Sequence, residues 1–405
     1  MWNRVLFVLV AAQFGCSVHI VCDLEPGCDI YDMRSSADFF VHRYIPPTVQ
    51  HVNYRHLAIS CIDNAFFSTI PTFVTSVEIF TSKHIRWLIV PSESNMSSVN
   101  VAYTGLRRFD VERGSALSAV SVASSNLDEI SPSVSYLEAA QDIAITSCLI
   151  ESVDLGVFCN MAKLQLLNFY GNRIRYVKNS ANSNCSLYDS LTTLTLSQNY
   201  LQSLNMGLLS PFRSLALLNV NENRVEAVFG SYETDANLTM FLQKNKIKSF
   251  DVCTWYVPRM HSLDLQHNQL STVPNCLEKL NGVSQLILAF NQLSNVSIES
   301  FAKMESLVYL NLCCNSMTSI SFNTTRYPIS LRTVLLAENN LTALDLSLVA
   351  VPSLEVDVEK NFIETFDVRK VSANVTKLLM RNNPIDCSWK TREERAYSTC
   401  VKNIV

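Results

Sequence analysis

Histidine, cysteine and the carboxylates are the residues of this sequence that could do chemistry, but their spacing matches no catalytic pattern. His51, His56 and Cys61 lie close in sequence, yet a structural role is favoured for them, and carboxylates such as Asp128 and Glu129 are read as solvated surface. No H-E-x-x-H zinc pattern, phosphate loop or nucleophile elbow occurs. We therefore expect no enzyme, no metal site and no cofactor. The histidines are His19, His42, His51, His56, His84, His261 and His267.

The thirteen cysteines point instead to disulfide chemistry. Residues 1–17 have the pattern of a secretory signal peptide, with Arg4, an apolar run and small residues near Ser17. No other apolar stretch is long enough to span a bilayer. Removal of the signal takes Cys16 with it and leaves an even number of cysteines, which is typical of disulfides in an oxidising compartment. We therefore expect a secreted, extracellular protein without a membrane span.

Seven N-x-S/T sequons agree with that compartment. Each sequon alone is a weak signal in a chain rich in Asn and Ser, but together with the signal peptide they favour a glycoprotein. Their asparagines are Asn95, Asn184, Asn237, Asn295, Asn323, Asn340 and Asn374.

The element that must position these residues is clearest at 191–201, LTTLTLSQNYL. Leu191, Leu194 and Leu196 alternate as a strand requires, Asn199 breaks the alternation, and Leu201 closes the unit. This is one rung of a leucine-rich repeat, L-x-x-L-x-L-x-x-N-x-L. Weaker rungs precede it, with Ser82, Thr104, Ser125 and Cys148 in place of the asparagine. Regular rungs carry Asn172, Asn199, Asn223, Asn245, Asn268, Asn291, Asn315, Asn339, Asn361 and Asn383.

Stacked rungs predict an α/β leucine-rich-repeat solenoid, a horseshoe with a parallel β-sheet on its concave face and disulfide-tied terminal caps. The buried Asn has amide donors and a carbonyl acceptor for backbone groups that the turn leaves unpaired. We assign the signal peptide to 1–17, an N-terminal cap to 18–60, about fourteen repeats to 61–385 and a C-terminal cap to 386–405.

Cysteine positions within the rungs predict disulfides. Cys253 and Cys276 each precede a rung by seven residues, so they occupy one column on adjacent turns, at a spacing that suits a disulfide. Cys159 and Cys185 precede their rungs by five and six residues and are candidates for another. A disulfide between Cys22 and Cys28 is expected to tie a hairpin that covers the first rung.

The remaining cysteines leave alternatives open. Cys148 is expected to be a buried, inert thiol in the column of asparagines. Cys313 and Cys314 are either packed thiols, a strained vicinal disulfide or the source of an intermolecular bond. Cys61 has no obvious mate and could join the N-terminal cap.

Side chains at the third, fifth and seventh rung positions project from the concave sheet, where repeat proteins usually bind their partners. Here they form an apolar track followed by an acidic rung and then a basic one. Aromatic anchors on such a track could carry interface energy, although scattered exposed apolar residues are also normal. The predicted partner-binding residues are Phe241, Asp264, Ile287, Phe290, Tyr309, Leu335, Glu355, Asp357, Glu359, Lys377 and Arg381.

Two stretches resemble known extracellular families. VTKLLMRNNPIDCSWKTREERAYSTC near the end resembles the C-terminal flanking cap of extracellular leucine-rich-repeat proteins, which implies a Cys387 to Cys400 disulfide. CDIYDM and the irregular early rungs are similar to the mosquito leucine-rich-repeat immune proteins, of the type without a coiled coil. Members of that family act in haemolymph with thioester-containing complement-like proteins.

The resemblance implies a secreted, non-enzymatic protein-binding scaffold of innate immunity. Its partner would be a thioester-containing complement-like factor, a pathogen surface or another leucine-rich-repeat chain. An extracellular adhesion or matrix-assembly protein is the alternative, because it would use the same solenoid. A net charge of -4 and 48% hydrophobic residues exclude disorder and argue against a nucleic-acid partner.

Overall fold

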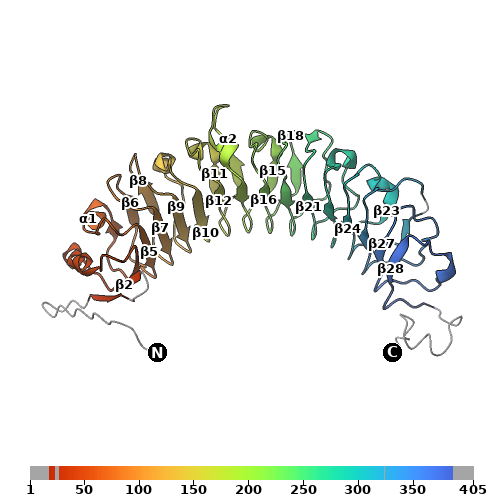
Figure 1. The fold of residues 1–405 in the computed structure, drawn as a ribbon, viewed down its shortest axis with the longest axis horizontal. Helices are drawn as coiled ribbons and strands as arrows, with labels where there is room; N and C mark the ends of the chain where they lie inside the picture. The colour runs from red at the N-terminus through yellow and green to blue at the C-terminus, as the bar shows by residue number, and fades with distance from the viewer. Residues whose placement is uncertain (1–17, 23–26, 323, 386–405) are drawn as a thin grey trace. The chain divides into compact units, whose positions relative to one another are not determined.

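The computed structural model describes residues 18–22, 27–322 and 324–385. The chain divides into two compact units, an N-terminal unit, Met1–Tyr200, and a C-terminal unit, Leu201–Val405. Each unit is a leucine-rich-repeat solenoid with a long sheet on one side and short strands and helical turns on the other (Figure 1). We call these two sides the sheet face and the outer face. The predicted signal peptide, Asn323 and the predicted C-terminal cap lie outside the described residues.

In the N-terminal unit, an antiparallel hairpin leads into a parallel sheet. β1 pairs with β2 antiparallel, and β2 pairs with β3 parallel. Repeat architecture therefore begins before residue 61, within the segment expected to form the cap. The sheet strands are β1 (His19–Cys22), β2 (Gly27–Tyr31), β3 (His51–Arg55), β5 (Ser76–Phe80), β7 (Ser98–Ala102), β9 (Ala119–Ala123), β10 (Asp142–Thr146), β12 (Leu166–Asn168) and β14 (Thr193–Thr195).

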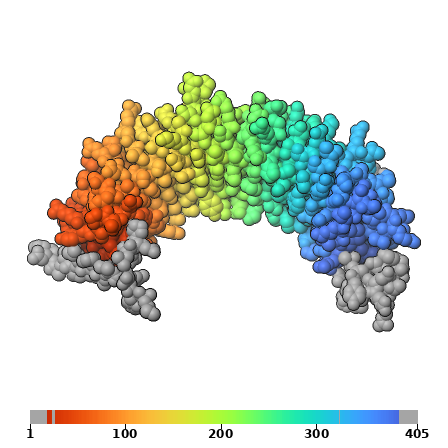
Figure 2. All heavy atoms as spheres, in the orientation of Figure 1, coloured from red at the N-terminus to blue at the C-terminus, as the bar shows by residue number. Residues whose placement is uncertain are grey.

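The outer face of this unit carries short elements, and the loop before α2 projects from it (Figure 2). These elements are η1 (Ser36–Tyr44), β4 (Cys61–Ile62), α1 (Asn64–Phe67), β6 (Trp87–Val90), β8 (Arg108–Val111), η2 (Pro132–Tyr136), β11 (Ser152–Asp154), η3 (Leu155–Phe158), β13 (Tyr176–Lys178) and α2 (Leu187–Ser190).

The C-terminal unit repeats the arrangement with a parallel sheet, most of whose strands have three residues. Its sheet contains β16 (Leu217–Asn219), β19 (Thr239–Phe241), β21 (Ser262–Asp264), β22 (Gln285–Ile287), β24 (Tyr309–Asn311), β26 (Thr333–Leu335), β27 (Leu354–Asp357) and β28 (Val375–Leu379). Its outer face contains β15 (Ser203–Asn205), η4 (Met206–Leu208), β17 (Ala227–Phe229), β18 (Tyr232–Glu233), β20 (Trp255–Tyr256), η5 (Leu277–Leu280), β23 (Asn295–Ser297), η6 (Ile298–Phe301), β25 (Ser319–Ser321) and η7 (Val368–Lys370).

Leucines at alternate strand positions fill the space between sheet and outer face. Leu263 and Leu265 are 0% exposed, as the period of two requires. The core therefore runs along each unit as a continuous apolar column. No helix among the described residues is long and apolar enough to cross a membrane.

The column of buried asparagines works as the sequence predicts. Nδ2 of Asn268 donates to the carbonyls of Leu242 and Leu265, both at 3.0 Å. Its Oδ1 accepts from the N–H of Ile247 at 3.0 Å. One side chain thus pairs backbone groups of two consecutive rungs, its own and the preceding one, and these groups stay buried and satisfied.

The predicted substitutes in the early rungs make fewer such bonds. Ser82 Oγ accepts from the N–H of Leu57 at 2.9 Å and donates to the carbonyl of Phe80 at 2.8 Å. The Sγ of Cys148 lies 3.3 Å from the carbonyl oxygen of Thr146. Cys148 is a buried free thiol, as expected.

The residue before this column adopts a left-handed backbone in rung after rung, a feature that the sequence reasoning missed. Gln198, His267 and Phe290 all have φ of 54°. This conformation is uncommon outside glycine. We call these residues the corner residues, because the chain turns there from the sheet towards the outer face.

His42 on η1 is a fully buried ionisable group of the N-terminal core. It is 0% exposed, with Nδ1 2.7 Å from the hydroxyl of Thr69 and Nε2 3.0 Å from that of Tyr54. Phe39 and Phe66 pack against its ring. Burial lowers the pKa of His42 from 6.5 to about 4, because the charged imidazolium would lose its hydration.

Candidate functional site

The sheet face of the C-terminal unit brings the predicted partner-binding residues together. Strand register aligns Phe241, Asp264 and Ile287 in one row. Tyr309 pairs with Gln285 of the preceding strand in a neighbouring row. The first row continues through Asn311, Leu335, Asp357 and Leu379.

This row alternates between Asn or Asp and an apolar residue over the whole unit. In each Asn or Asp, a side-chain oxygen accepts a hydrogen bond from the backbone N–H two residues later, as Asn311 does from Cys313 at 3.0 Å. Such turns hold the polar side chains close to the backbone. The apolar side chains are the ones left to project, at about 10 Å intervals on alternate strands. The row is Asn219, Phe241, Asp264, Ile287, Asn311, Leu335, Asp357 and Leu379.

Asp264 corrects one expectation, because its side chain does not project for a partner. It is 3% exposed, and its carboxylate accepts from the backbone N–H of Gln266 at 3.0 Å and from that side chain at 3.2 Å. Burial raises the pKa of Asp264. This residue therefore shapes the turn and is not a contact residue.

Phe290 is an exposed aromatic residue at the edge of this face. Its ring stacks on that of His267, with centroids 4.0 Å apart and planes 13° apart. Phe290 remains 44% exposed. Both are corner residues with left-handed backbones, so the pair is held by backbone geometry and by stacking. A preordered aromatic ring is a suitable interface anchor.

The predicted charge switch is largely neutralised within the chain. Glu355 lies 3.4 Å from Lys377, and Glu359 lies 3.8 Å from Arg381. The side chains of Lys377, Glu355 and Arg381 are about half exposed or more, so each pair contributes little to folding stability. Their mutual pairing leaves the apolar row as the main feature available to a partner.

Cys313 and Cys314 are free thiols on the same face. Burial, together with nearby carboxylates, raises the pKa of Cys313 to about 11 and that of Cys314 to about 12. The Sγ of Cys314 lies 3.4 Å from a carboxylate oxygen of Glu338. Since the thiolate is the reactive form, these surroundings weigh against spontaneous bond formation with another chain.

Three of the predicted disulfides are confirmed. They join Cys22 to Cys28, Cys159 to Cys185 and Cys253 to Cys276, with Cα separations of 4.1, 4.8 and 5.0 Å. Cys61 is free, and Cys387 and Cys400 lie outside the described residues. Asp251 lies with Cys253 and Cys276 in a cluster of potential ligand atoms, but the disulfide withholds both thiolates from a metal ion.

The structure separates the polar residues that lie close in sequence near the N-terminus. His51 lies in β3 on the sheet face, where its ring is 3.0 Å from the hydroxyl of Ser76 and 2.9 Å from an oxygen of Asn53. His56 is a corner residue, and Cys61 lies in β4 on the outer face. The trio therefore forms no common site.

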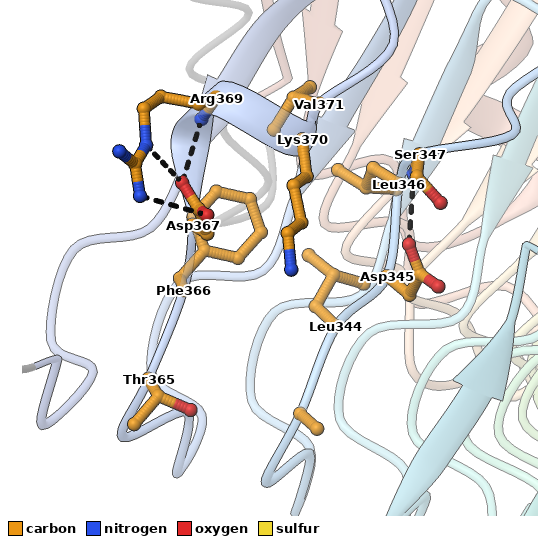
Figure 3. A pocket seen from close by; sticks show the side chains of 11 residues that line it. Leu344, Asp345, Leu346, Ser347, Thr365, Phe366, Asp367, Arg369, Lys370 and Val371 are labelled. Atoms are coloured by element: carbon orange, nitrogen blue, oxygen red, sulfur yellow. Dashed lines mark hydrogen bonds and ion pairs between the residues drawn. The ribbon is translucent and has the colours of Figure 1, made fainter.

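The outer face of the C-terminal unit contains a cavity of about 780 Å³ (Figure 3). Leu344 and Phe366 line it and are half-buried, whereas their equivalents in β23 and β25, Val296 and Ile320, are each 7% exposed. The segments 343–345 and 365–367 do not form strands, whereas the equivalent β23 and β25 pair with each other. The cavity therefore marks a local opening of the outer layer.

The charged groups of this cavity are balanced. Arg369 is bound to Asp367 through two of its nitrogens, at 3.0 and 3.2 Å, and Lys370 extends over the opening towards Asp345 and Leu344 (Figure 3). Two acids and two bases leave no net charge to select an ion. We therefore place the candidate site on the sheet face.

Comparison with known proteins supports the repeat assignment. A leucine-rich-repeat family model matches residues 281–341. The chain is 24% identical to podocan of Mus musculus over 230 residues, which are 56% of this chain and 33% of podocan. It is 27% identical to human lumican over 164 residues, 39% of this chain and 45% of lumican. The matched regions thus cover less than half of either relative.

A solved structure agrees at the level of fold. The LRIM1/APL1C complex contains a chain that matches with a TM-score of 0.61 and 16% identity, over 89% of this chain and 62% of that chain. Together with the observed rungs, these findings define a leucine-rich-repeat protein. Proteins of this class generally serve as binding scaffolds.

Proposed function

We propose that this protein is a secreted, non-enzymatic scaffold of innate immunity that binds a protein partner through the sheet face of its C-terminal unit. The partner class is a thioester-containing complement-like factor or a pathogen-surface protein. The apolar row with its Phe290 anchor is the observation that carries the proposal. Spaced apolar side chains beside a fixed aromatic ring suit the core of a protein interface.

The positions of the sequons support the choice of face. Asn95 and Asn237 lie in loops that enter the sheet, Asn295 lies in the outer strand β23, and Asn340 follows the buried Asn339. Asn184 lies in the loop before α2, and Asn374 directly precedes β28. None of these six asparagines lies in the row from Phe241 to Leu379.

The immune role rests on the resemblance to the mosquito immune proteins, and the fold match to the LRIM1/APL1C complex supports it. The sequence similarity to podocan and lumican favours the second candidate, an adhesion or matrix-assembly protein. Disulfides within the rungs fit an extracellular site of action for both candidates. Both would use the same face.

Affinity capture from the producing organism's body fluid tests the proposal. The mature protein is immobilised, and retained proteins are identified with and without reductant. The Phe290→Ala and Leu335→Glu variants should each weaken retention of the complement-like factor by about tenfold or more, because hot-spot residues contribute about 2 kcal/mol or more. Phe229→Ala, at a 51% exposed outer-face position, is the matched control and should bind normally.

The outcomes separate the two candidates. Retention of a complement-like factor, lost in both sheet-face variants, supports the immune scaffold. Constitutive deposition in matrix with no soluble pool would contradict it and favour adhesion. Equal binding by Phe290→Ala, Leu335→Glu and wild type would show that the sheet face is not the contact surface.

A further inference from the structure

A second surface with unpaired charge lies at the other end of the chain, in the first three rungs of the N-terminal unit. A cavity of about 320 Å³ opens there at the corner residues Asp32, His56 and Thr81. Arg34 and Lys83 also line it, each two residues after a corner residue. Three consecutive rungs therefore contribute to one cavity by the same positions of the repeat.

The backbone around this cavity is fixed by hydrogen bonds between rungs. The N–H of Asp32 donates to the carbonyl of Arg55 at 3.1 Å, and that of Ala58 donates to the carbonyl of Met33 at 2.8 Å. The N–H of Arg34 donates to the Asp38 carboxylate at 2.7 Å. The cavity is thus preformed, which lowers the entropic cost of binding.

Ala58 creates the space between two cations. It occupies the rung position that Arg34 holds in the preceding rung and Lys83 in the following one. Since adjacent rungs stack at about 5 Å, the two long side chains originate about 10 Å apart with only a methyl group between them. An anion lying over Ala58 can reach both cations.

The charge at this cavity is unlike that of the sheet face. His56 and His84 join Arg34 and Lys83 in the lining, opposed by the single carboxylate of Asp32. Among the described residues, none of these four basic side chains forms an ion pair. The sheet-face lysines of the C-terminal unit are paired across rungs, as Lys244 is with Glu222, Lys360 with Glu338 and Lys377 with Glu355.

We propose that this cavity binds an anionic saccharide, with sulfate or phosphate groups held by Arg34 and Lys83. Guanidinium and ammonium groups are the usual protein partners of such oxyanions. Asp32 and Thr81 add a carboxylate and a hydroxyl beside the cations, which suits the hydroxyl groups of a sugar better than a bare ion. This ligand does not compete for the sheet face, so the inference stands apart from the proposed function.

Calorimetric titration of the full mature protein tests the proposal with two probes. A heparin tetrasaccharide represents a sulfated host glycan, and the de-acylated bisphosphorylated glucosamine disaccharide of lipopolysaccharide represents a microbial one. The Arg34→Gln/Lys83→Gln double variant should weaken binding at least about tenfold, because it removes both charge-assisted bonds to the anion. Added salt should weaken wild-type binding as well.

Two further variants separate charge at the cavity from charge in general. Ala58→Glu adds an acid between the cations and should reduce binding without removing any of them. Lys279→Gln/Lys303→Gln removes the same charge from exposed positions of the C-terminal unit and should bind as wild type does. Unchanged circular dichroism and thermal melting would show that each variant is folded.

The results decide between the alternatives. Suppose that either saccharide binds, and that Arg34→Gln/Lys83→Gln and Ala58→Glu lose this binding while the Lys279→Gln/Lys303→Gln control keeps it. That result supports the site, and the saccharide that binds shows whether the ligand is a host or a microbial one. Absence of binding to both probes would overturn it, and so would a double variant that binds normally. Equally tight binding of DNA or phosphatidylserine vesicles at the same residues would contradict the saccharide assignment.

Discussion

Early rungs of the N-terminal unit place Ser82, Thr104 or Ser125 in the buried column, whereas the C-terminal unit places asparagine there. Ser82 makes two backbone bonds in that column, and Asn268 makes three bonds of 3.0 Å. Strand length changes in the opposite sense, because β5 and β7 have five residues and β19 and β21 have three. The rungs with longer strands thus have fewer hydrogen bonds from the column residue at the turn.

The same contrast extends to the exposed surfaces. β9 presents Ala119, Ser121 and Ala123 at its outward positions, so this part of the N-terminal sheet offers little side chain to a partner. The C-terminal row presents Phe241, Ile287 and other large apolar residues. In this row, Asn or Asp at alternate rungs holds the turn, so the residues at the rungs between them are not needed for the turn and can vary. Hydrogen bonding at the turn and large outward-facing apolar side chains are thus both concentrated in the C-terminal unit.

Removal of one column side chain from each unit should give the largest effect. Asn268→Ala is expected to cost about 4 kcal/mol, because three hydrogen bonds are lost and the buried N–H of Ile247 is left without a partner. The carbonyls of Leu242 and Leu265 keep the amides of Asn245 and Asn291 as donors. Ser82→Ala should cost about 2 kcal/mol, since it removes two hydrogen bonds and a smaller side chain. Urea denaturation of both variants measures the difference. A Ser82→Ala cost equal to that of Asn268→Ala would contradict the comparison.

Acidification should weaken the N-terminal unit through His42. The unfolded chain takes up this proton near pH 6.5, whereas the folded protein resists it until about pH 4. The stability contribution is therefore complete above about pH 6.5 and is lost as pH falls towards 4, by about 3 kcal/mol in total.

Denaturation midpoints of wild type and His42→Gln at several pH values between 7 and 4 measure this effect. The variant lacks the titrating group, so its stability should decline less steeply over that range. Parallel curves for the two proteins would exclude His42 as the cause.

Asp264 should respond to pH in the opposite direction, with the smallest effect. Burial raises its folded pKa, so ionisation opposes folding at neutral pH and the penalty disappears as pH falls below the folded pKa. An amide in place of this carboxylate would not ionise, and its oxygen can still accept from Gln266. The Asp264→Asn variant should therefore be up to about 1 kcal/mol more stable than wild type at pH 7, as measured by urea denaturation. A loss of stability at that pH would contradict the assignment.

The repeating parts of the fold were predictable because a fixed period converts sequence position into spatial position. The Asn column, the buried Cys148 and the Cys253 to Cys276 disulfide all follow from counting residues within rungs. For Glu355 and Lys377, the sequence indicated only that an acidic rung is followed by a basic one, and not that the two side chains form an ion pair. That the two side chains lie 3.4 Å apart is known only from the observed strand register.

Features that depend on backbone conformation and local packing could not be predicted in this way. Nothing in the period indicates the left-handed backbone of His267 and Phe290, and therefore nothing indicates their stacking. Burial of Asp264 depends on its turn with Gln266, although the Asn or Asp at alternate fifth positions was a signal that could have been used. The N-terminal cavity escaped notice because the rungs around Ala58 are too irregular to align by sequence.

The sheet face of the C-terminal unit is the proposed contact surface of the protein. Hydroxyl-radical footprinting of the protein, alone and with its captured partner, tests it most directly because it reports the exposure of individual side chains. Oxidation of Phe290, Tyr309 and Leu335 should fall in the complex, while that of Phe229 and Tyr256 on the outer face stays unchanged. Protection of Phe229 and Tyr256 with Phe290 still fully oxidised would contradict the account.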